Sequence, residues 1–487
     1  MHSLRRPDLV KSDAFVAGQW AQADRGATFD VTNPATGDVI AQVPDMGVDE
    51  TRRAIQGAEE ARHAWATQTG KQRAAILRKL FNLLMENQED LAQILTAEQG
   101  KPLFESRGEI AYAASFIEWF AEEAKRTYGD VIPSHAADKR IIVLKQPIGV
   151  CAAITPWNFP MAMITRKVGP ALAAGCSIVV KPAEATPLSA LALCVLAEEA
   201  GLPAGLLSCI TSEKGASVGG ELTSNELVRK LSFTGSTRTG ALLMQQSAAQ
   251  IKKVSLELGG NAPFIVFDDA DIDAAVTGAI AAKFRNAGQT CVCTNRFYAQ
   301  SGVYDEFVEK LASATDQLVV GHGKDEGVEI GPLINAQGLE KVETHLQDAV
   351  SKGAQLVTGG KRSNVGALFY TPTVIADADA NMLIASEETF GPIAPVFKFE
   401  TEAEAIASAN DTSAGLAAYV YTQNLGRVWR VSEALEYGMV GVNEGVVSTE
   451  VAPFGGVKES GIGREGSKYG IDEYLELKYM LLGGLGL

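Results

Sequence analysis

The stretch IGVCAAITPWNFPMAMITRKVGPALAAGCSIVVK occupies residues 148–181. Its two short apolar runs, residues 148–155 and 177–181, have the length and composition of buried strands, and residues 161–174 between them have the pattern of a helix. A strand, a helix and a second strand in this order predict a right-handed βαβ unit with parallel strands. Ligands of such sheets bind at the carboxyl ends of the strands, and function is expected there.

Strands and helices continue to alternate after this unit. Residues 51–127 have helical periodicity, and strands are expected only from about residue 141 onward. A second α/β pattern restarts after the pair Gly259-Gly260. We therefore predict an α/β fold of two doubly wound parallel-sheet domains, the first of them Rossmann-like. The expected domains are residues 1–124 with 148–258, and residues 259–470. Further expected elements are strands at 231–234, 254–256, 264–267, 297–300, 395–397, 417–421 and 441–443, and helices at 188–200 and 241–249.

Two segments, residues 125–147 and 471–487, fit neither domain. The first contains an exposed-looking strand at 139–145, and the second carries the apolar run Met480-Leu481-Leu482. An apolar strand edge left open is an aggregation hazard, so pairing with another subunit is expected. We predict a small β oligomerisation element and a homo-oligomer, either a dimer or a tetramer.

Composition excludes several classes of protein. The chain has 487 residues, of which 46% are hydrophobic and 21% charged, as in soluble proteins of two or three domains. Its net charge of −16 argues against binding to nucleic acid and to an anionic membrane surface. The first 15 residues lack the apolar core of a signal peptide, and no apolar stretch reaches the roughly 18 residues that span a bilayer. We predict a cytoplasmic protein with reduced thiols and no metal ion.

A candidate nucleophile lies in FRNAGQTCVC, residues 284–293, where Cys291 sits among small polar residues and glycine. The carboxylate of Glu257 is alone in an otherwise uncharged segment, and an unpaired carboxylate at the end of a buried strand is costly. A cysteine nucleophile and a carboxylate base are therefore predicted. The remaining cysteines lie among apolar residues and are expected in the core: Cys151, Cys176, Cys194 and Cys209.

A glycine-containing turn, TGSTRTG at residues 234–240, follows a predicted strand and leads into a predicted helix. Free N–H groups at the start of a helix suit a pyrophosphate. The turn lacks the G-x-G-x-x-G spacing and is not a Walker A sequence. Considered alone, a plain strand-to-helix turn explains it equally well.

These segments belong to an ordered set of motifs through which the chain resembles the NAD(P)-dependent aldehyde dehydrogenases along nearly its whole length. The motifs are PWNFP (156–160), KPAE (181–184), FTGS (233–236), LELGGN (256–261), GQTC (288–291), EETFGP (387–392) and PFGG (453–456). Within that family the chain is most similar to the succinate-semialdehyde dehydrogenases. This finer resemblance is carried by KFRN (283–286), CVC (291–293), GVNEG (441–445) and Ser448.

The resemblance implies a role for each matching residue. Cys291 is the expected nucleophile, which forms a thiohemiacetal and, after hydride loss, a thioester. The side-chain amide of Asn158 and the backbone N–H of Cys291 are expected to hold the oxyanion, and Glu257 to activate the hydrolytic water. Lys181 is implied among the catalytic residues and beside the cofactor ribose. Glu388 is expected to hold the nicotinamide ribose, and Glu465 matches a carboxylate proposed to relay protons. Further cofactor contacts are expected from Trp157, Asn158, Gly235, Ser236 and Leu258.

Several of these residues also have an ordinary structural explanation. Asn158 is a common type of turn or cap residue, and Lys181 precedes Pro182 and could end a strand. Glu388 could lie on a solvated face, and Glu465, which follows Arg464, could form an exposed ion pair.

Glu184 bears on the choice of cofactor. A carboxylate there accepts hydrogen bonds from a ribose 2′-hydroxyl and repels a 2′-phosphate, so NAD is favoured. The NADP-preferring bacterial relatives tend to have a small hydroxyl residue at this position. Lys181 partly offsets the repulsion, and NADP use stays possible.

Substrate choice depends on cations able to hold a second carboxylate. Arg166 and Arg285 match the arginines that look like carboxylate holders in succinate-semialdehyde dehydrogenases, and Ser448 adds a hydroxyl donor. The alternative for Arg166 is that it extends from an amphipathic helix to solvent. The expected partner is a small aldehyde that carries a carboxylate, with succinic semialdehyde preferred. The alternative substrate is glutaric semialdehyde or a broader range of aldehydes. An alternative reaction, in which the thioester passes to coenzyme A and not to water, would not need Glu257 as a base, so the presence of Glu257 favours hydrolysis.

Cys293 lies two residues from the expected nucleophile. A sulfenic acid formed at Cys291 could be captured by this thiol, which would give a disulfide that a reductant reverses. The alternative is that Cys293 is a packing residue.

Overall fold

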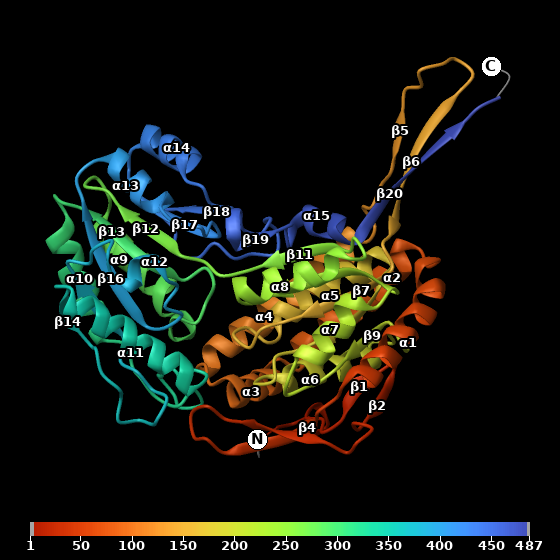
Figure 1. The fold of residues 1–487 in the computed structure, drawn as a ribbon, viewed down its shortest axis with the longest axis horizontal. Helices are drawn as coiled ribbons and strands as arrows, with labels where there is room; N and C mark the ends of the chain where they lie inside the picture. Colours follow the sequence, from red (N-terminus) through yellow and green to blue (C-terminus); the bar gives the residue numbers. More distant parts are fainter. Residues whose placement is uncertain (1–3, 485–487) are drawn as a thin grey trace.

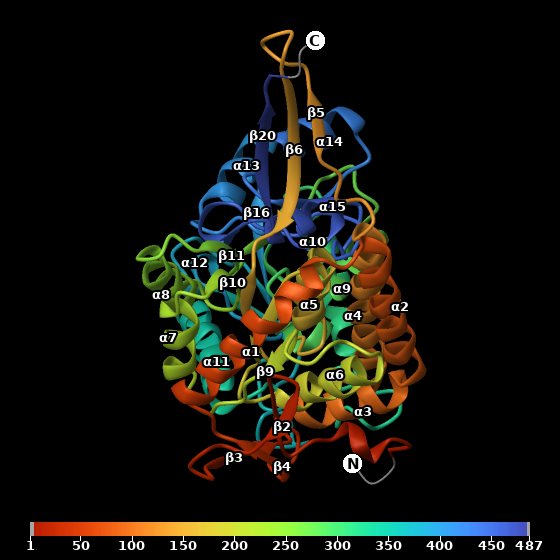
Figure 2. The same cartoon turned by 90° about the vertical axis from the view of Figure 1, so that its right-hand side faces the viewer.

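The structure is a computed structural model that describes residues 4–484. Residues 1–3 of the predicted first domain and 485–487 of the predicted C-terminal segment lie outside the described residues. Figure 1 shows two lobes side by side and an arm that projects from the first lobe. The turned view in Figure 2 places the same arm at one end of the molecule, away from the N-terminus. Within the described residues, no helix combines the length and the hydropathy that a membrane crossing requires.

The first lobe contains an eight-stranded sheet in the order β19-β11-β10-β7-β8-β9-β1-β2. The five central neighbours, β11 to β9, are parallel, which confirms the predicted α/β sheet, whereas β19, β1 and β2 are antiparallel at the edges. The strands are β1 Ala14–Val16, β2 Gln19–Ala21, β7 Val150–Ile154, β8 Ser177–Lys181, β9 Leu207–Cys209, β10 Val228–Thr234, β11 Lys253–Glu257 and β19 Gly461–Ile462. The helices are α1 Val48–Ala66, α2 Gly70–Glu86, α3 Gln88–Gln99, α4 Leu103–Glu123, α5 Ala162–Ala174, α6 Pro187–Glu199, α7 Ala216–Ser224 and α8 Thr237–Ala248.

The second lobe contains a seven-stranded sheet in the order β14-β15-β16-β13-β12-β17-β18. All neighbours are parallel except β14, which runs antiparallel to β15. The strands are β12 Ala262–Val266, β13 Thr294–Gln300, β14 Gln355–Thr358, β15 Thr373–Ala376, β16 Ile393–Phe399, β17 Ala417–Tyr421 and β18 Met439–Val442. The helices are α9 Ile272–Phe284, α10 Tyr304–Asp316, α11 Ala336–Ser351, α12 Leu383–Ser386, α13 Glu402–Asn410 and α14 Leu425–Ala434. The short α15, Ser467–Gly470, lies against the first lobe (Figure 1).

The two sheets follow one another at the predicted restart of the pattern. β11 ends at Glu257 and β12 begins at Ala262, so only residues 258–261 connect them. The short strand β19 comes from the segment assigned to the second domain, yet it pairs with β11 of the first sheet. The chain therefore returns to the first lobe before its end, and the division at residues 124, 148, 258 and 470 stays a prediction.

The expectation that strands begin only near residue 141 was wrong. Before α1 the chain forms β1, β2 and a separate two-stranded sheet of β3 (Thr28–Thr32) and β4 (Val39–Pro44). β1 is buried and apolar but only three residues long, and β2, β3 and β4 are partly exposed, so none has the longer apolar run that marked the later strands.

The arm is a three-stranded antiparallel sheet in the order β20-β6-β5. Its strands are β5 Asp130–Ile132, β6 Arg140–Pro147 and β20 Leu475–Leu482, and β6 and β20 pair along their full lengths. Large apolar side chains are exposed on it, with Val131 at 78% and Leu477 at 70%. The predicted segments thus form one element, and its predicted role in oligomerisation stays a prediction.

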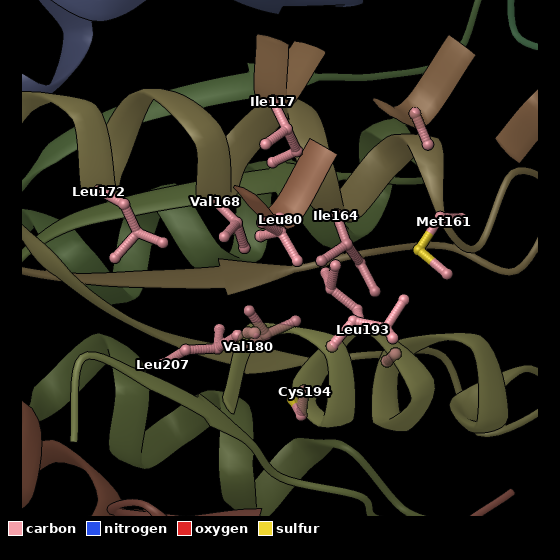
Figure 3. Packing of buried hydrophobic residues seen from close by; sticks show 14 of the residues in the cluster. Leu80, Ile117, Met161, Ile164, Val168, Leu172, Val180, Leu193, Cys194 and Leu207 are labelled. Atoms are coloured by element: carbon pink, nitrogen blue, oxygen red, sulfur yellow. The ribbon is translucent and has the colours of Figure 1, made fainter. Parts of the chain in front are cut away.

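The core of the first lobe lies between the sheet and the helices that cover it. Figure 3 shows side chains of α5, such as Val168 and Leu172, packed toward Val180 of β8 and Leu193 of α6. Each side chain of this size contributes about 1.5–3 kcal/mol when it leaves water. The four cysteines expected in the core are buried there: Cys151, Cys176, Cys194 and Cys209. This packing holds both ends of α5, and with them the turn that precedes it.

Candidate active site

A cavity of about 220 Å³ lies where residues of both sheets meet. It takes its lining from the turn after β7, the turn after β10, the end of β11 and the loop before β13. The structure thereby gathers most of the site predicted from the motifs. The lining residues are Pro156, Trp157, Asn158, Thr234, Gly235, Ser236, Glu257, Leu258, Gly259, Cys291, Glu388 and Phe390.

The loop that carries Cys291 has a constrained backbone. Asn286, Ala287 and Gly288 have φ values of 51°, 54° and 76°, which is the left-handed region. For the non-glycine residues Asn286 and Ala287 this conformation costs about 1–3 kcal/mol each, so it persists only where the surroundings fix it. Here the Asn286 N–H donates to Glu105 (3.0 Å) and the Gln289 amide to the Pro332 carbonyl (3.3 Å). The loop is held in place from both lobes.

Cys291 is half-buried at the end of this loop. Burial and the nearby Glu388 carboxylate raise the pKa of its thiol to about 12, against the opposing effect of Arg166. The resting sulfur is therefore protonated, and a base must take its proton before it attacks.

Asn158 is buried in the turn between β7 and α5. Its side-chain nitrogen donates to the Gln289 carbonyl at 3.1 Å, and its side-chain oxygen accepts from the Phe159 N–H at 3.1 Å. Asn158 therefore does stabilise a turn, as its ordinary structural explanation predicted. An amide nitrogen has two hydrogens, and the second has no acceptor among residues 4–484. That hydrogen is available to a ligand in the cavity.

Glu257 ends β11, between Thr234 of β10 and Gly461 of β19. The residue is 2% exposed, and its Oε2 atom has no hydrogen-bond partner in the described part of the chain. Burial, and then the charge of Glu465, raise the pKa of this carboxyl well above its usual value. A carboxylate that is poorly solvated in this way is a strong proton acceptor.

Glu465 lies in a buried charge cluster. Its Oε1 atom accepts a hydrogen bond from Lys167, and its Oε2 atom lies 3.4 Å from Arg166 Nη1. The alternative of an exposed ion pair is wrong, because Glu465 is 5% exposed and Arg464 donates to backbone carbonyls. Sequence reasoning missed Lys167, whose partner lies 298 residues away. The alternative of a solvent-directed Arg166 is also wrong, since that residue is 1% exposed.

A second cavity, of about 490 Å³, has Arg285 and Ser448 in its lining, together with Tyr112 and Phe159. Arg285 is half-buried, with its guanidinium carbon 5.3 Å from the centre of the Phe159 ring, and it forms no ion pair with residues 4–484. Arg166 is outside this lining. It donates to the Tyr112 hydroxyl and stacks over other aromatic rings, so Tyr112 separates it from the cavity.

The turn after β10 begins α8 as predicted. Ser236 caps the helix by accepting from the Thr239 N–H at 3.3 Å, and the Gly235 N–H donates to the Glu257 carbonyl at 3.0 Å. Trp157 meets Phe390 edge-on across the first cavity, with ring centres 5.6 Å apart.

Glu388 lies in the cavity lining and not on a solvated face. It accepts a hydrogen bond from the Gly260 N–H at 3.2 Å, and burial raises its pKa to about 7. Lys181 and Glu184 lie outside this lining, at the end of β8. Lys181 is buried, which lowers its pKa, and its ammonium lies 3.8 Å from the half-exposed carboxylate of Glu184.

Cys293 is buried, and its thiol contacts the carbonyl of Lys283 at 3.2 Å. Both Cys291 and Cys293 are free thiols. The reversible disulfide between them stays a prediction.

The chain matches the Aldehyde dehydrogenase family over residues 20–480. It is 63% identical over 480 residues to the Escherichia coli protein named succinate-semialdehyde dehydrogenase (NADP(+)), covering 99% of each chain. It is 62% identical over 482 residues to the glutarate-semialdehyde dehydrogenase of Pseudomonas aeruginosa, covering 99% of this chain and 100% of that protein. The crystal structure of succinate-semialdehyde dehydrogenase from Burkholderia pseudomallei has 61% identity and a TM-score of 0.98, with coverage of 99% and 100%. The chain therefore belongs to the aldehyde dehydrogenase family.

Proposed function

We propose that this enzyme oxidises succinic semialdehyde to succinate, with a nicotinamide dinucleotide as hydride acceptor. The observation that supports this substrate is the position of Arg285. Its half-buried guanidinium lines the second cavity and forms no ion pair with residues 4–484. In the sequence Arg285 lies six residues before Cys291. A planar cation in that position suits a carboxylate, and Ser448 adds a second donor.

In this proposal the chain's own residues move protons and hold charge. Cys291 releases its proton to water in the cavity, and its sulfur bonds to the aldehyde carbon. The second N–H of Asn158 and the Cys291 N–H stabilise the oxyanion. The dinucleotide, when bound, accepts the hydride from that carbon. Glu257 then takes a proton from water, whose oxygen displaces the sulfur and releases the carboxylic acid.

Protons delivered to Glu257 need a route out of a buried site. Glu465 is close enough to raise the pKa of Glu257, and it is hydrogen-bonded to Lys167. A lysine and a carboxylate in direct contact exchange a proton readily. We assign Glu465, with Lys167, to this relay.

The residues around the first cavity fit a dinucleotide. The start of α8, where Ser236 is the cap, offers backbone N–H groups to a pyrophosphate, and the preceding Gly235, whose own N–H donates to the Glu257 carbonyl, places no side chain at that turn. Glu388 suits the nicotinamide ribose, and Lys181 with Glu184 suits the adenosine ribose. Trp157, Asn158 and Leu258 complete the contacts.

The choice between NAD and NADP depends on Glu184. Its exposed carboxylate accepts from a 2′-hydroxyl and opposes a 2′-phosphate, and the ammonium of Lys181, 3.8 Å away, reduces that opposition. The Escherichia coli relative is named for NADP(+). We propose that NAD is preferred and that NADP is also used.

Glutaric semialdehyde is the second candidate substrate. A relative named for it is 62% identical to this chain, close to the 63% of the relative named for succinate semialdehyde. One methylene group is worth only about 1–3 kcal/mol of discrimination. We propose that both aldehydes are oxidised, the shorter one faster.

The enzyme is also proposed to be a cytoplasmic homo-oligomer, either a dimer or a tetramer. Exposed apolar side chains on the arm support assembly, and six free cysteines support a reducing compartment.

Kinetics with matched aldehydes test the proposal. Succinic semialdehyde and butanal have the same chain length, and only the first carries a carboxylate. A pairing with Arg285 worth about 2–5 kcal/mol should give succinic semialdehyde the higher kcat/KM, and Arg285→Ala should remove most of that advantage. Arg285→Lys, which keeps the charge but not the planar fork, is the matched control and should lose less. Equal kcat/KM for the two aldehydes in the unmodified enzyme would overturn the substrate assignment.

A further inference from the structure

A buried ion pair lies behind the turn that carries Asn158. Lys101 follows α3, and Glu109 lies on α4; both side chains are fully buried. The Lys101 ammonium is 2.6 Å from Glu109 Oε2. Neither residue lines the cavity that contains Cys291.

Every polar group of this pair is directed at the turn between β7 and α5. The Lys101 ammonium also donates to the backbone carbonyl of Asn158 at 2.7 Å and lies 3.8 Å above the Phe159 ring. The second oxygen of Glu109 accepts from the N–H groups of Met161 (2.9 Å) and Ala162 (3.3 Å), at the start of α5. The pair therefore holds residues 158–162 at both ends.

The same turn is tied to the nucleophile loop. Asn286 donates to the Asn158 carbonyl at 3.0 Å, and its own side-chain oxygen accepts from Gln99 at 2.9 Å. The Asn158 amide donates to Gln289 at 3.1 Å. One carbonyl thus receives donors from Lys101 and from the loop, so a shift of Asn158 would be felt at the nucleophile loop.

We propose that Lys101 and Glu109 are positioning residues that fix the side-chain amide of Asn158 for the oxyanion. The inference rests on the proposed function, in which Asn158 holds that oxyanion. Burying an ion pair gains little stability compared with apolar packing of the same volume, so this pair has little to offer the fold itself. The pair instead fixes the position of the turn. A hydrogen-bond donor stabilises a transition state only when it is held within a few tenths of an ångström of its place beside the developing charge.

The test is a double-mutant cycle on the rate of the first NADH burst with succinic semialdehyde. Loss of an oxyanion donor costs about 100- to 1000-fold in kcat, so Asn158→Ala should slow the burst by that order. Lys101→Met, which keeps the length of the side chain, should slow it by roughly 10-fold or more without changing the dissociation constant of NAD. In the double variant the Lys101→Met loss should disappear, because the amide that it positions is gone.

Lys230 provides a matched control. It is likewise a buried lysine of the first lobe, 3.4 Å from Glu473, and it contacts no residue of the cavity that holds Cys291. Lys230→Met removes the same group and should lower the melting temperature by a similar amount while leaving the burst rate unchanged. If Lys101→Met does not fold, Glu109→Gln carries the same cycle, since it weakens the hold on Lys101 and keeps an acceptor for the two N–H groups. Because Glu109 also lines the second cavity, the burst rate of this variant is measured at saturating succinic semialdehyde.

The outcomes separate the two proposals. If Asn158→Ala leaves the burst rate intact, the oxyanion role of Asn158 fails. If Asn158→Ala is slow but Lys101→Met is as fast as Lys230→Met, only the positioning role fails. Losses that multiply in the double variant would also overturn it, because they would show that Lys101 acts independently of Asn158.

Discussion

In the proposed mechanism Cys291 and Glu257 act in different halves of the reaction, and a single substitution should separate these halves. Glu257→Gln keeps the shape of the side chain and removes its capacity as a base. Hydride loss does not require a base for water, so we expect a burst of NADH followed by slow turnover. Stopped-flow absorbance measures both phases. Steady-state turnover equal to that of the unmodified enzyme would remove Glu257 from thioester hydrolysis.

The pH dependence of the same two groups has a definite sign. Burial and Glu465 raise the pKa of Glu257, and burial and Glu388 raise that of Cys291 to about 12. Both groups act in their deprotonated forms, which become populated only as pH rises through the raised values. We therefore expect kcat/KM to increase from about pH 6 to pH 10. A flat or falling profile, measured where the enzyme stays folded, would contradict the assignment.

Sequence motifs located the residues that act directly, and they did so for a physical reason. Asn158, Glu257 and Cys291 each sit in a turn or at a strand end, where glycine, proline and an isolated polar group stand out from apolar surroundings. Lys101 and Lys167 left no such signal. Lys101 pairs with Glu109, eight residues away, but the Asn158 carbonyl that it contacts is 57 residues away, and Glu465 is 298 residues from Lys167. Their contacts with the site therefore form only when the fold brings these segments together.

The loop before β13 depends on a glycine. Gly288 has φ 76°, and a Cβ atom there would lie 2.3 Å from the Gly391 carbonyl oxygen. Gly288→Ala should therefore move the nucleophile, lower kcat at least about 10-fold and reduce stability by about 1–3 kcal/mol. Thermal unfolding and steady-state kinetics measure the two effects. Gly201→Ala is the matched control: it has φ 85° with open space around it, so it should lose some stability and no activity.

At the level of elements, the long apolar segments were predictable and the short ones were not. The strands β7, β8 and β17 follow their apolar runs closely. β9 and β14 are three and four residues long, and β14 is mostly exposed, so neither has the extent that distinguishes a strand from a loop. Their place in a sheet is decided by neighbours that are distant in sequence.

We expect the arm to govern how the whole molecule associates. Leu477 and Tyr479 on β20 are 70% and 59% exposed, and apolar side chains of that extent are normally covered by a partner. Replacing both with Glu should shift the enzyme to a smaller species in sedimentation velocity, with little change in the free energy of unfolding of each lobe. Val350→Glu, at a position 45% exposed on α11, is the control. An unchanged sedimentation coefficient in the arm variant would show that β20 takes no part in association.

The pairing of β6 with β20 also fixes when the arm can form during synthesis of the chain. Full registry joins Arg140–Pro147 to Leu475–Leu482, so one partner leaves the ribosome long before the other. At about 5–20 residues per second, the roughly 330 residues between them take on the order of 16 to 66 s. Throughout that interval the nascent chain carries β6 with one edge unsatisfied, and β20 then covers it. The arm is therefore complete only when the chain is complete. We expect a chain that stalls on the ribosome before Leu475 to expose the unpaired edge of β6 to chaperones and proteases.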